Sequence, residues 1–390
     1  MTVPDWIWYL FVFANGCCIG SFLNVVVYRM PRDKSLISPP SSCPACGRRI
    51  HFYDNVPLIS WILLGGKCRF CKAPVSPRYF IIELLTGLVF IGVFILYFST
   101  DLREGVPAFL EGGWLFYLLH IILLSSFIAA SAIDLELWII PLGICWFVTI
   151  AAFVVSAISG FVIDSAVIAK FSLFPRASFL TGSLAVGASV GLAISTVLLM
   201  TGLLKRSYEG QDSDQQNNSA GDDTSARPDV PPEGDFNHRL EACREIIFLL
   251  PIIICSLAAY VILSELVSTA WQKGFAVQHP AIAGLLGSVW GYFIGCGMVW
   301  AIRIFGAFAF GKEAMGLGDV HLMGAAGAAI GPIMVVVAFF VAPFFGLAWA
   351  GSQMFFKKVR QIPYGPFLSL GVFVVIIFHD FIISRIYYLF

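Results

Sequence analysis

Charged residues are scarce in this sequence. Asp, Glu, Lys and Arg together make up 12% of the 390 residues, about half of the ~25% typical of soluble globular proteins. Hydrophobic residues make up 58%, and the mean hydropathy is +0.85. This composition excludes a soluble globular enzyme and predicts an integral membrane protein. The net charge is zero, so total charge identifies no partner, and we expect membrane lipids but no nucleic acid around the chain.

The first apolar segment lacks the features of a cleaved signal peptide. No basic stretch precedes it, and no small-residue cleavage site follows it. Trp6 and Trp8 stand near its start, as expected for aromatic residues at a membrane interface. We therefore interpret it as a retained first membrane span.

Ten apolar segments follow one another along the chain, most of them long enough to cross a membrane as helices. They lie at about residues 6–28, 80–98, 114–133, 138–160, 178–203, 246–267, 282–306, 319–331, 333–355 and 366–388. The sequence therefore predicts an all-α polytopic membrane protein with about ten transmembrane helices. Gly331 and Pro332 interrupt what would otherwise be one apolar run, and we interpret segments eight and nine as a hairpin.

Basic residues concentrate between the first two segments, where only Asp33 and Asp54 oppose them. By the positive-inside rule, residues 29–79 are predicted to lie in the cytoplasm and the N-terminus outside. With the hairpin, later basic clusters such as that around Lys357 fall on the same side. The stretch 207–245 is acidic and poor in large apolar residues, so we expect a disordered cytoplasmic loop. An acidic dock for a basic ligand is the alternative.

Two C-x-x-C pairs lie in the predicted cytoplasmic segment 29–79. Each pair can present two thiolates to one tetrahedral metal, and the spacer of residues 47–67 matches ribbon-like zinc sites. The reducing cytoplasm disfavours a disulfide. We expect a closed, structural zinc site in a small zinc-ribbon-like insertion, with a redox pair or an unmetallated remnant as alternatives. Its ligands would be Cys43, Cys46, Cys68 and Cys71.

Two aspartates mark the cytoplasmic ends of predicted spans. Asp134 ends the third span, and Asp319 opens the eighth. Gly316 and Gly318 allow another backbone to approach Asp319 closely. Two carboxyl groups that share a proton can act as general base and general acid in peptide hydrolysis. From spacing alone, two unrelated interfacial acids remain an alternative to this pair.

The chain resembles the bacterial type IV prepilin peptidases, also called prepilin leader peptidases. The resemblance covers roughly residues 1–155 and 280–390. It is carried by "GSFLNVVVYRMP" (20–31), the paired C-x-x-C, "PRYFIIELLTG" (77–87), Asp134 with "IIP" (139–141), "GLGD" (316–319) and "IPYGPFLSLG" (362–371).

This resemblance implies an aspartic endopeptidase that cuts the basic leader from prepilins or pseudopilins at the cytoplasmic face of the bacterial inner membrane. Many members also N-methylate the new N-terminus with S-adenosylmethionine. Asp134 and Asp319 match the catalytic aspartates, and the four cysteines match the zinc-binding set. The residues that we expect to support the site are Gly316, Gly318, His321, Pro141, Gly365 and Pro366.

The sequence departs from the family pattern in three places. Leu142 stands where Asp or Asn is usual, and Tyr364 stands where Phe is usual. His321 replaces a usual lysine, which would remove a fixed positive charge near the acid pair. A proton- or ion-coupled transporter and a degenerate assembly scaffold are the alternative functions.

The expected domains follow from these features. They are a first span (1–28), a cytoplasmic zinc-knuckle domain (29–79), helices carrying the first aspartate (80–160), an inserted pair of spans with the acidic loop 207–245 (161–280), and helices carrying G-x-G-D (281–390). Among other polar residues, we expect Asn24 and Ser21 to form helix–helix hydrogen bonds, with contact to the substrate or methyl donor as the alternative. We expect Glu83 to pair with a basic neighbour such as Arg78, and Glu136 to face solvent.

Overall fold

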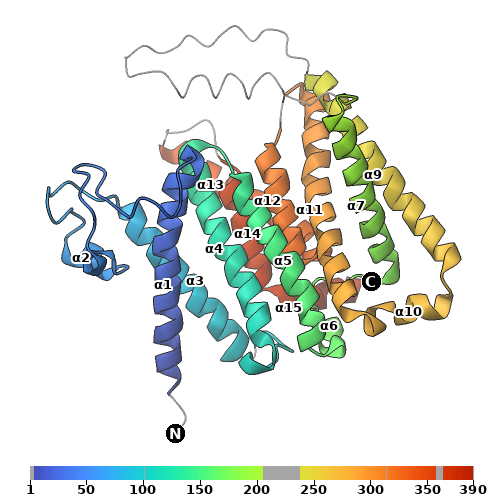
Figure 1. Cartoon of the computed structure of the whole chain (residues 1–390), viewed down its shortest axis with the longest axis horizontal. Coiled ribbons are helices and arrows are strands. Elements are labelled where there is room, and N and C mark those ends of the chain that lie inside the picture. The colour runs from blue at the N-terminus through green and yellow to red at the C-terminus, as the bar shows by residue number, and fades with distance from the viewer. Residues whose placement is uncertain (1–3, 101, 205–237, 313, 357–362, 390) are drawn as a thin grey trace.

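The computed structural model describes residues 4–100, 102–204, 238–312, 314–356 and 363–389 (Figure 1). Within these ranges the regular structure is helical, apart from two isolated β-bridges in the cysteine-containing segment. Apolar stretches become helices because a backbone in lipid must satisfy its own hydrogen bonds. The predicted all-α class is therefore confirmed for the described part of the chain.

Eight of the described helices are long and apolar enough to cross a membrane. They are α1 (Asp5–Arg29), α3 (Pro77–Phe98), α4 (Gly113–Leu137), α5 (Leu142–Val162), α7 (Phe179–Met200), α9 (His238–Leu266), α11 (Pro280–Phe310) and α13 (Pro332–Phe356). The chain is thus a multi-pass membrane protein, and eight of the ten predicted segments form helices of spanning length.

The other two predicted segments have a different geometry. Helix α12 (Leu317–Ile330) has 14 residues, or about 21 Å, which is less than the ~30 Å of a bilayer core. The predicted break between segments eight and nine is confirmed, since α12 ends at Ile330 and Gly331 has a φ of +85°. The last segment is not one straight helix, because α14 (Gly365–Ile377) and α15 (His379–Leu389) meet at an angle of 78°.

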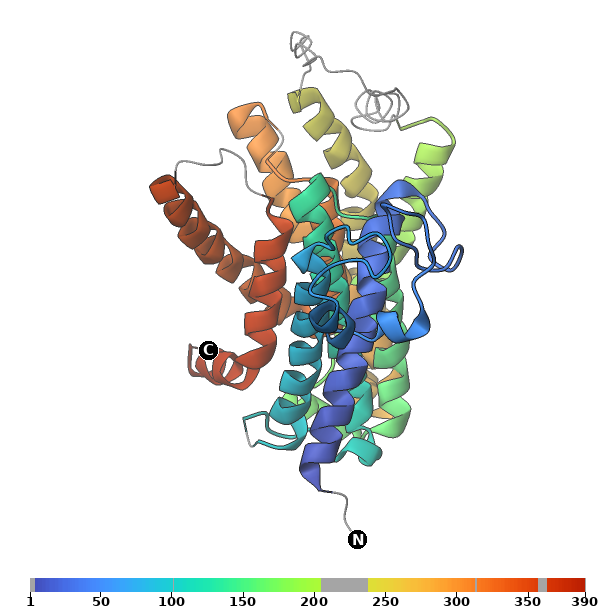
Figure 2. The same cartoon turned by 90° about the vertical axis from the view of Figure 1, so that its left-hand side faces the viewer.

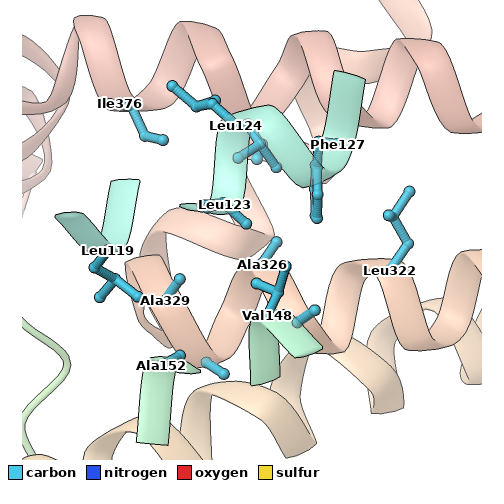
Figure 3. Close-up of a cluster of buried hydrophobic side chains, with 14 of the residues drawn as sticks. Leu119, Leu123, Leu124, Phe127, Val148, Ala152, Leu322, Ala326, Ala329 and Ile376 are labelled. Atoms are coloured by element: carbon cyan, nitrogen blue, oxygen red, sulfur yellow. The ribbon is translucent and has the colours of Figure 1, made fainter. Parts of the chain in front are cut away.

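Helix α12 lies in the centre of the bundle and is buried along most of its length. Figure 3 shows side chains of α4, α5, α12 and α14 meeting there, among them Leu123, Val148, Leu322 and Ala326. A helix that is apolar all round is stable only when neighbours cover every face. The position of α12 therefore explains how so short a helix is held.

Small residues let α11 and α12 approach closely. A Cβ on Gly291 would lie 2.0 Å from the carbonyl oxygen of Gly327, and a Cβ on Gly295 would lie 2.1 Å from that of Met323. Close backbone contact between small residues is a common way for membrane helices to associate. The small residues that follow Asp319 therefore let α12 pack tightly against α11.

The predicted inserted region contributes α6 (Ser165–Phe171), α7, α9 and α10 (Thr269–Gln278). Helices α7 and α9 pack along each other, with the Ser195 hydroxyl donating to the Phe248 carbonyl at 2.7 Å. Residues 205–237, most of the predicted acidic loop, lie outside the described residues, and α9 begins at His238, before the predicted end of that loop.

The cysteine-containing segment connects α1 to α3 through η1 (Met30–Arg32), η2 (Phe52–Asn55) and α2 (Ile59–Leu63). It lies beside α1 and α3, on the opposite side of the bundle from α7 and α9 (Figures 1 and 2). The end of α4 and the start of α12 lie at the same end of the bundle (Figure 1). That end therefore carries both predicted aspartates.

Candidate active site

Asp134 lies in the last turn of α4 and is buried, with an exposed fraction of 6%. Its Oδ2 accepts a hydrogen bond of 3.0 Å from the backbone N–H of Gly365, the first residue of α14. The N-terminus of a helix presents N–H groups and a positive dipole, which favour an anion. The start of α14 therefore orients the Asp134 carboxyl group.

Asp319 lies in the first turn of α12 and is also buried, with an exposed fraction of 9%. Its Oδ2 accepts a hydrogen bond of 3.3 Å from the N–H of Gly316, and its own N–H donates to the Gly316 carbonyl at 3.2 Å. This reciprocal pair resembles a capping box without the N-cap side chain. The carboxyl group is thereby fixed to the loop that precedes α12.

Two short segments lie near these aspartates. They are the loop between α4 and α5, which contains Ile140, and Tyr364 with Gly365 at the start of α14. A Cβ on Gly365 would lie 2.7 Å from Asp134 Oδ2 and 3.1 Å from Ile140 Cδ1, and a Cβ on Gly318 would lie 2.8 Å from Ile140 Cβ. Burial raises the pKa of Tyr364, the residue before Gly365, to about 12, with a further contribution from the charge of Asp319. Ile140 thus lies beside both Gly365, which contacts Asp134, and Gly318, which precedes Asp319.

The expected supporting residues divide into two groups. Pro141 precedes the first turn of α5, and Pro366 lies in the first turn of α14, beside the loops just described. His321 instead faces α5 and α11, where its Nδ1 lies 3.1 Å from the Tyr292 hydroxyl and its ring 5.9 Å from that of Trp146. Residues two apart on a helix point in nearly opposite directions, so the His321 side chain lies on a different face of α12 from that of Asp319.

The four predicted cysteine ligands lie together. Their sulfur atoms are all within 4.8 Å of one another, and Cys43 Sγ lies 3.8 Å from Cys71 Sγ. Tetrahedral zinc with Zn–S bonds of about 2.3 Å requires S···S distances of about 3.8 Å. The cluster therefore has the dimensions of a four-sulfur metal site.

The two halves of this cluster have the same backbone structure. The N–H of Cys43 donates to Arg48 O at 2.9 Å, and that of Cys68 donates to Ala73 O at 2.9 Å. The N–H groups of Cys71 and Phe70 lower the pKa of the Cys68 thiol to about 6. The turn after Cys68 thus favours its thiolate, the form that binds a metal, whereas desolvation and the neighbouring thiols raise the pKa of Cys71 to about 11.

One expectation for a single carboxylate was wrong. Glu83 does not pair with Arg78, because its Oε2 accepts a hydrogen bond of 2.8 Å from the N–H of Leu58. Arg78 instead forms an ion pair with Glu136, whose side chain is exposed, as predicted. The prediction for Asn24 is confirmed, since its Nδ2 donates to Tyr79 O on α3 at 3.1 Å.

A buried ion pair that the sequence reasoning missed connects α9 to the loop before Asp319. Arg303 Nε donates to Glu245 Oε1 at 2.9 Å, and the two side chains are 5% and 6% exposed. Trp300 Nε1 donates to the other carboxylate oxygen at 2.9 Å, and Arg303 Nη1 donates to the Met315 carbonyl at 2.8 Å. An arginine in an apolar segment was the available signal, since such a residue requires a partner.

Comparison with known proteins places these features in a family. A family model described as the Bacterial Peptidase A24 N-terminal domain matches residues 14–97. A prepilin leader peptidase/N-methyltransferase of Aeromonas hydrophila is 30% identical over 249 residues, which covers 51% of this chain and 79% of that protein. The chain belongs to the prepilin leader peptidase/N-methyltransferase family. The predicted family is therefore confirmed.

Other family members align over shorter regions. The prepilin leader peptidase/N-methyltransferase of Myxococcus xanthus (strain DK1622) is 42% identical over 135 residues, 34% of this chain and 36% of that protein. A type 4 prepilin-like proteins leader peptide-processing enzyme of Escherichia coli O78:H11 is 38% identical over 162 residues, 36% of this chain and 55% of that protein. No solved structure matches the chain. The matched domain model includes all four clustered cysteines, whereas Asp134 and Asp319 lie beyond it.

Proposed function

We propose that this member of the prepilin leader peptidase/N-methyltransferase family is an aspartic endopeptidase that removes the basic leader from type IV prepilins or pseudopilins. The supporting observation is that two buried aspartates, one ending α4 and one opening α12, lie at the same end of the bundle, where Ile140 packs beside both Gly365, the partner of Asp134, and Gly318, the residue before Asp319. Both lie at one end of the bundle rather than halfway along it, where transporters usually bind their substrates. This arrangement favours hydrolysis at a membrane edge over transport.

Asp134 and Asp319 would share one proton in this reaction. The ionised carboxylate takes a proton from the attacking water, and the protonated one donates to the oxygen of the scissile carbonyl. The N–H groups of Gly365 and Gly316 orient the two carboxyl groups before substrate arrives. Such preorganisation lowers the cost of reaching the transition state.

Zinc is the metal that we propose for the cysteine cluster. Four thiolates leave no position for water or substrate, so the ion would stabilise the fold of residues 29–79 rather than take part in hydrolysis. Described residues of this segment form only short helices and two isolated bridges, a small amount of regular structure for about fifty residues. The metal would hold this segment beside α1 and α3.

N-methylation with S-adenosylmethionine is the second activity that we propose, from the names of the relatives. A cavity of about 350 Å³ between α1 and the cysteine-containing segment has the size of a small-ligand site. Ser21 and Asn55 line it and offer hydroxyl and amide groups for a polar nucleoside. The Arg29 guanidinium also lines it but already donates to the carbonyls of Ser35 and Pro39. When bound, S-adenosylmethionine supplies the methyl group.

The proposed orientation has the N-terminus outside and the active site at the cytoplasmic face of the bacterial inner membrane. It is supported by the basic residues of segment 29–79 and by the positive-inside rule. Prepilin leaders would then meet the aspartates on the side where they are synthesised.

The function is tested by co-expressing the chain with a type IV prepilin and recording the N-terminus of the product by mass spectrometry. We expect Asp134→Asn and Asp319→Asn each to lower cleavage by about 10²–10⁴-fold or more, because each removes an acid–base group. Asp33→Asn is the matched control, since Asp33 is exposed and asparagine tolerates its φ of +50°. Wild-type cleavage by both active-site variants would reject the aspartic mechanism, and a mass increase of one methyl group would reveal methylation.

A further inference from the structure

A large groove lies between the helices of the predicted inserted region and the rest of the bundle. It has a volume of about 1440 Å³ and is lined by α7, α9, α11 and Trp146 of α5. Figure 1 shows α7, α9 and α11 on one side of the molecule. The lining is mostly apolar, as expected for a space at membrane depth.

One face of α9 is exposed along this groove. Ile246, Leu250, Ile253 and Leu257 recur at helical spacing, all line the groove, and are 41–57% exposed. At membrane depth an apolar stripe of this kind packs against lipid or against another helix. No described element of the chain covers it.

The groove reaches the first turn of α12, the turn that carries Asp319. Leu317 and His321, which stand two residues before and two residues after Asp319, both line it. His321 lies beside Tyr292, a further lining residue on α11. An occupant of the groove would therefore end next to the first turn of α12.

The charges at this end of the groove disfavour a phospholipid headgroup. Arg303 and Arg244 line the groove, but Arg303 pairs with Glu245 and Arg244 pairs with Glu241. Among the lining residues that the structure describes, each cation is thus neutralised by a carboxylate. A lipid phosphate would have to compete with these carboxylates for the two arginines, whereas an apolar helix brings no charge that requires a partner.

We propose that the groove holds the apolar membrane segment of the prepilin while its leader is cut. This inference rests on the proposed function, because acids at the end of a membrane bundle can reach only peptide bonds at the membrane edge. A substrate cut there must continue into the bilayer, where its backbone requires a helix. A helix about 10 Å across fills a volume of 1440 Å³ over about 18 Å, or about twelve residues.

Photo-cross-linking tests the occupant of the groove. The photoreactive residue benzoylphenylalanine is introduced at Ile253 or Ile254, in full-length chain that is co-expressed with prepilin. The two isoleucines are adjacent and are 57% and 55% exposed, but only Ile253 lines the groove. We expect a prepilin adduct from position 253 at several times the yield from position 254.

A glycine pair provides a second test that changes no contact of the native fold. Gly297 lines the groove and Gly92 of α3 lies outside it, and a Cβ on either would meet nothing within 4 Å. Gly297→Phe should partly fill the groove and lower kcat/KM for prepilin by about tenfold or more, mainly through KM. Gly92→Phe should leave cleavage and melting temperature at their wild-type values.

Wild-type cleavage of prepilin is measured first, in the same membranes, so that failure of the proposed function is recognised separately. Given cleavage, equal prepilin adducts at positions 253 and 254 would overturn the groove assignment and leave the peptidase intact. An adduct at position 253 with phospholipid alone would also overturn it. Unchanged KM in Gly297→Phe with an unchanged melting temperature would do the same.

Discussion

The ion pair between Glu245 and Arg303 gives the sharpest prediction about the active-site loop. We expect Glu245→Gln to destabilise the protein by about 3 kcal/mol, the lower end of the ~3–5 kcal/mol for removing one partner of a buried pair. Glutamine keeps the size of the side chain but leaves the buried charge of Arg303 uncompensated. Arg303 also donates to the Met315 carbonyl, so a displaced Arg303 would move the loop before Asp319. A displacement of about 1 Å can cost about 10²-fold in rate.

The assay combines thermal unfolding of the purified chain in detergent with prepilin cleavage. Glu265→Gln is the control, since Glu265 lies on the same helix but is exposed. Replacing the pair by Glu245→Leu with Arg303→Met should recover stability, because apolar residues often replace a buried pair without loss. The double variant should not recover cleavage, because the Met315 carbonyl then lacks the hydrogen bond that Arg303 donates. Wild-type melting and cleavage in Glu245→Gln, or full cleavage by the double variant, would refute the reasoning.

Three further predictions follow from single contacts. Cys46→Ser should abolish binding of the one zinc expected per chain, measured by metal analysis of protein purified without chelator; wild-type protein free of zinc would contradict the site. Gly365→Ala should lower cleavage by about 10²-fold, because its Cβ would lie 2.7 Å from Asp134 Oδ2; an unchanged rate would show that this contact does not matter. Glu83→Ala should remove the acceptor for the Leu58 N–H and lower the free energy of unfolding by about 1–3 kcal/mol. Limited proteolysis within residues 56–66 should then be faster, and a wild-type digestion pattern would argue against this role.

Local sequence signals predicted the membrane helices because their cause is local. A backbone in lipid must form its hydrogen bonds within one helix, so each long apolar run reports a helix directly. The break at Gly331 and Pro332 was also predictable from the local sequence. Proline lacks an N–H and is favoured in the first turn of a helix, here α13. The cysteine cluster was predictable because C-x-x-C spacing alone brings two sulfur atoms together.

Contacts between distant segments were decided only by the tertiary structure. Glu83 accepts from Leu58 rather than pairing with Arg78, and Glu245 reaches Arg303, because the rotation and crossing of packed helices select one partner among many. The 78° bend between α14 and α15 and the groove beside α9 have the same origin. Apolar periodicity determines which residues form spans, but every apolar face can pack against lipid or protein, so only the assembled bundle determines which neighbour it receives.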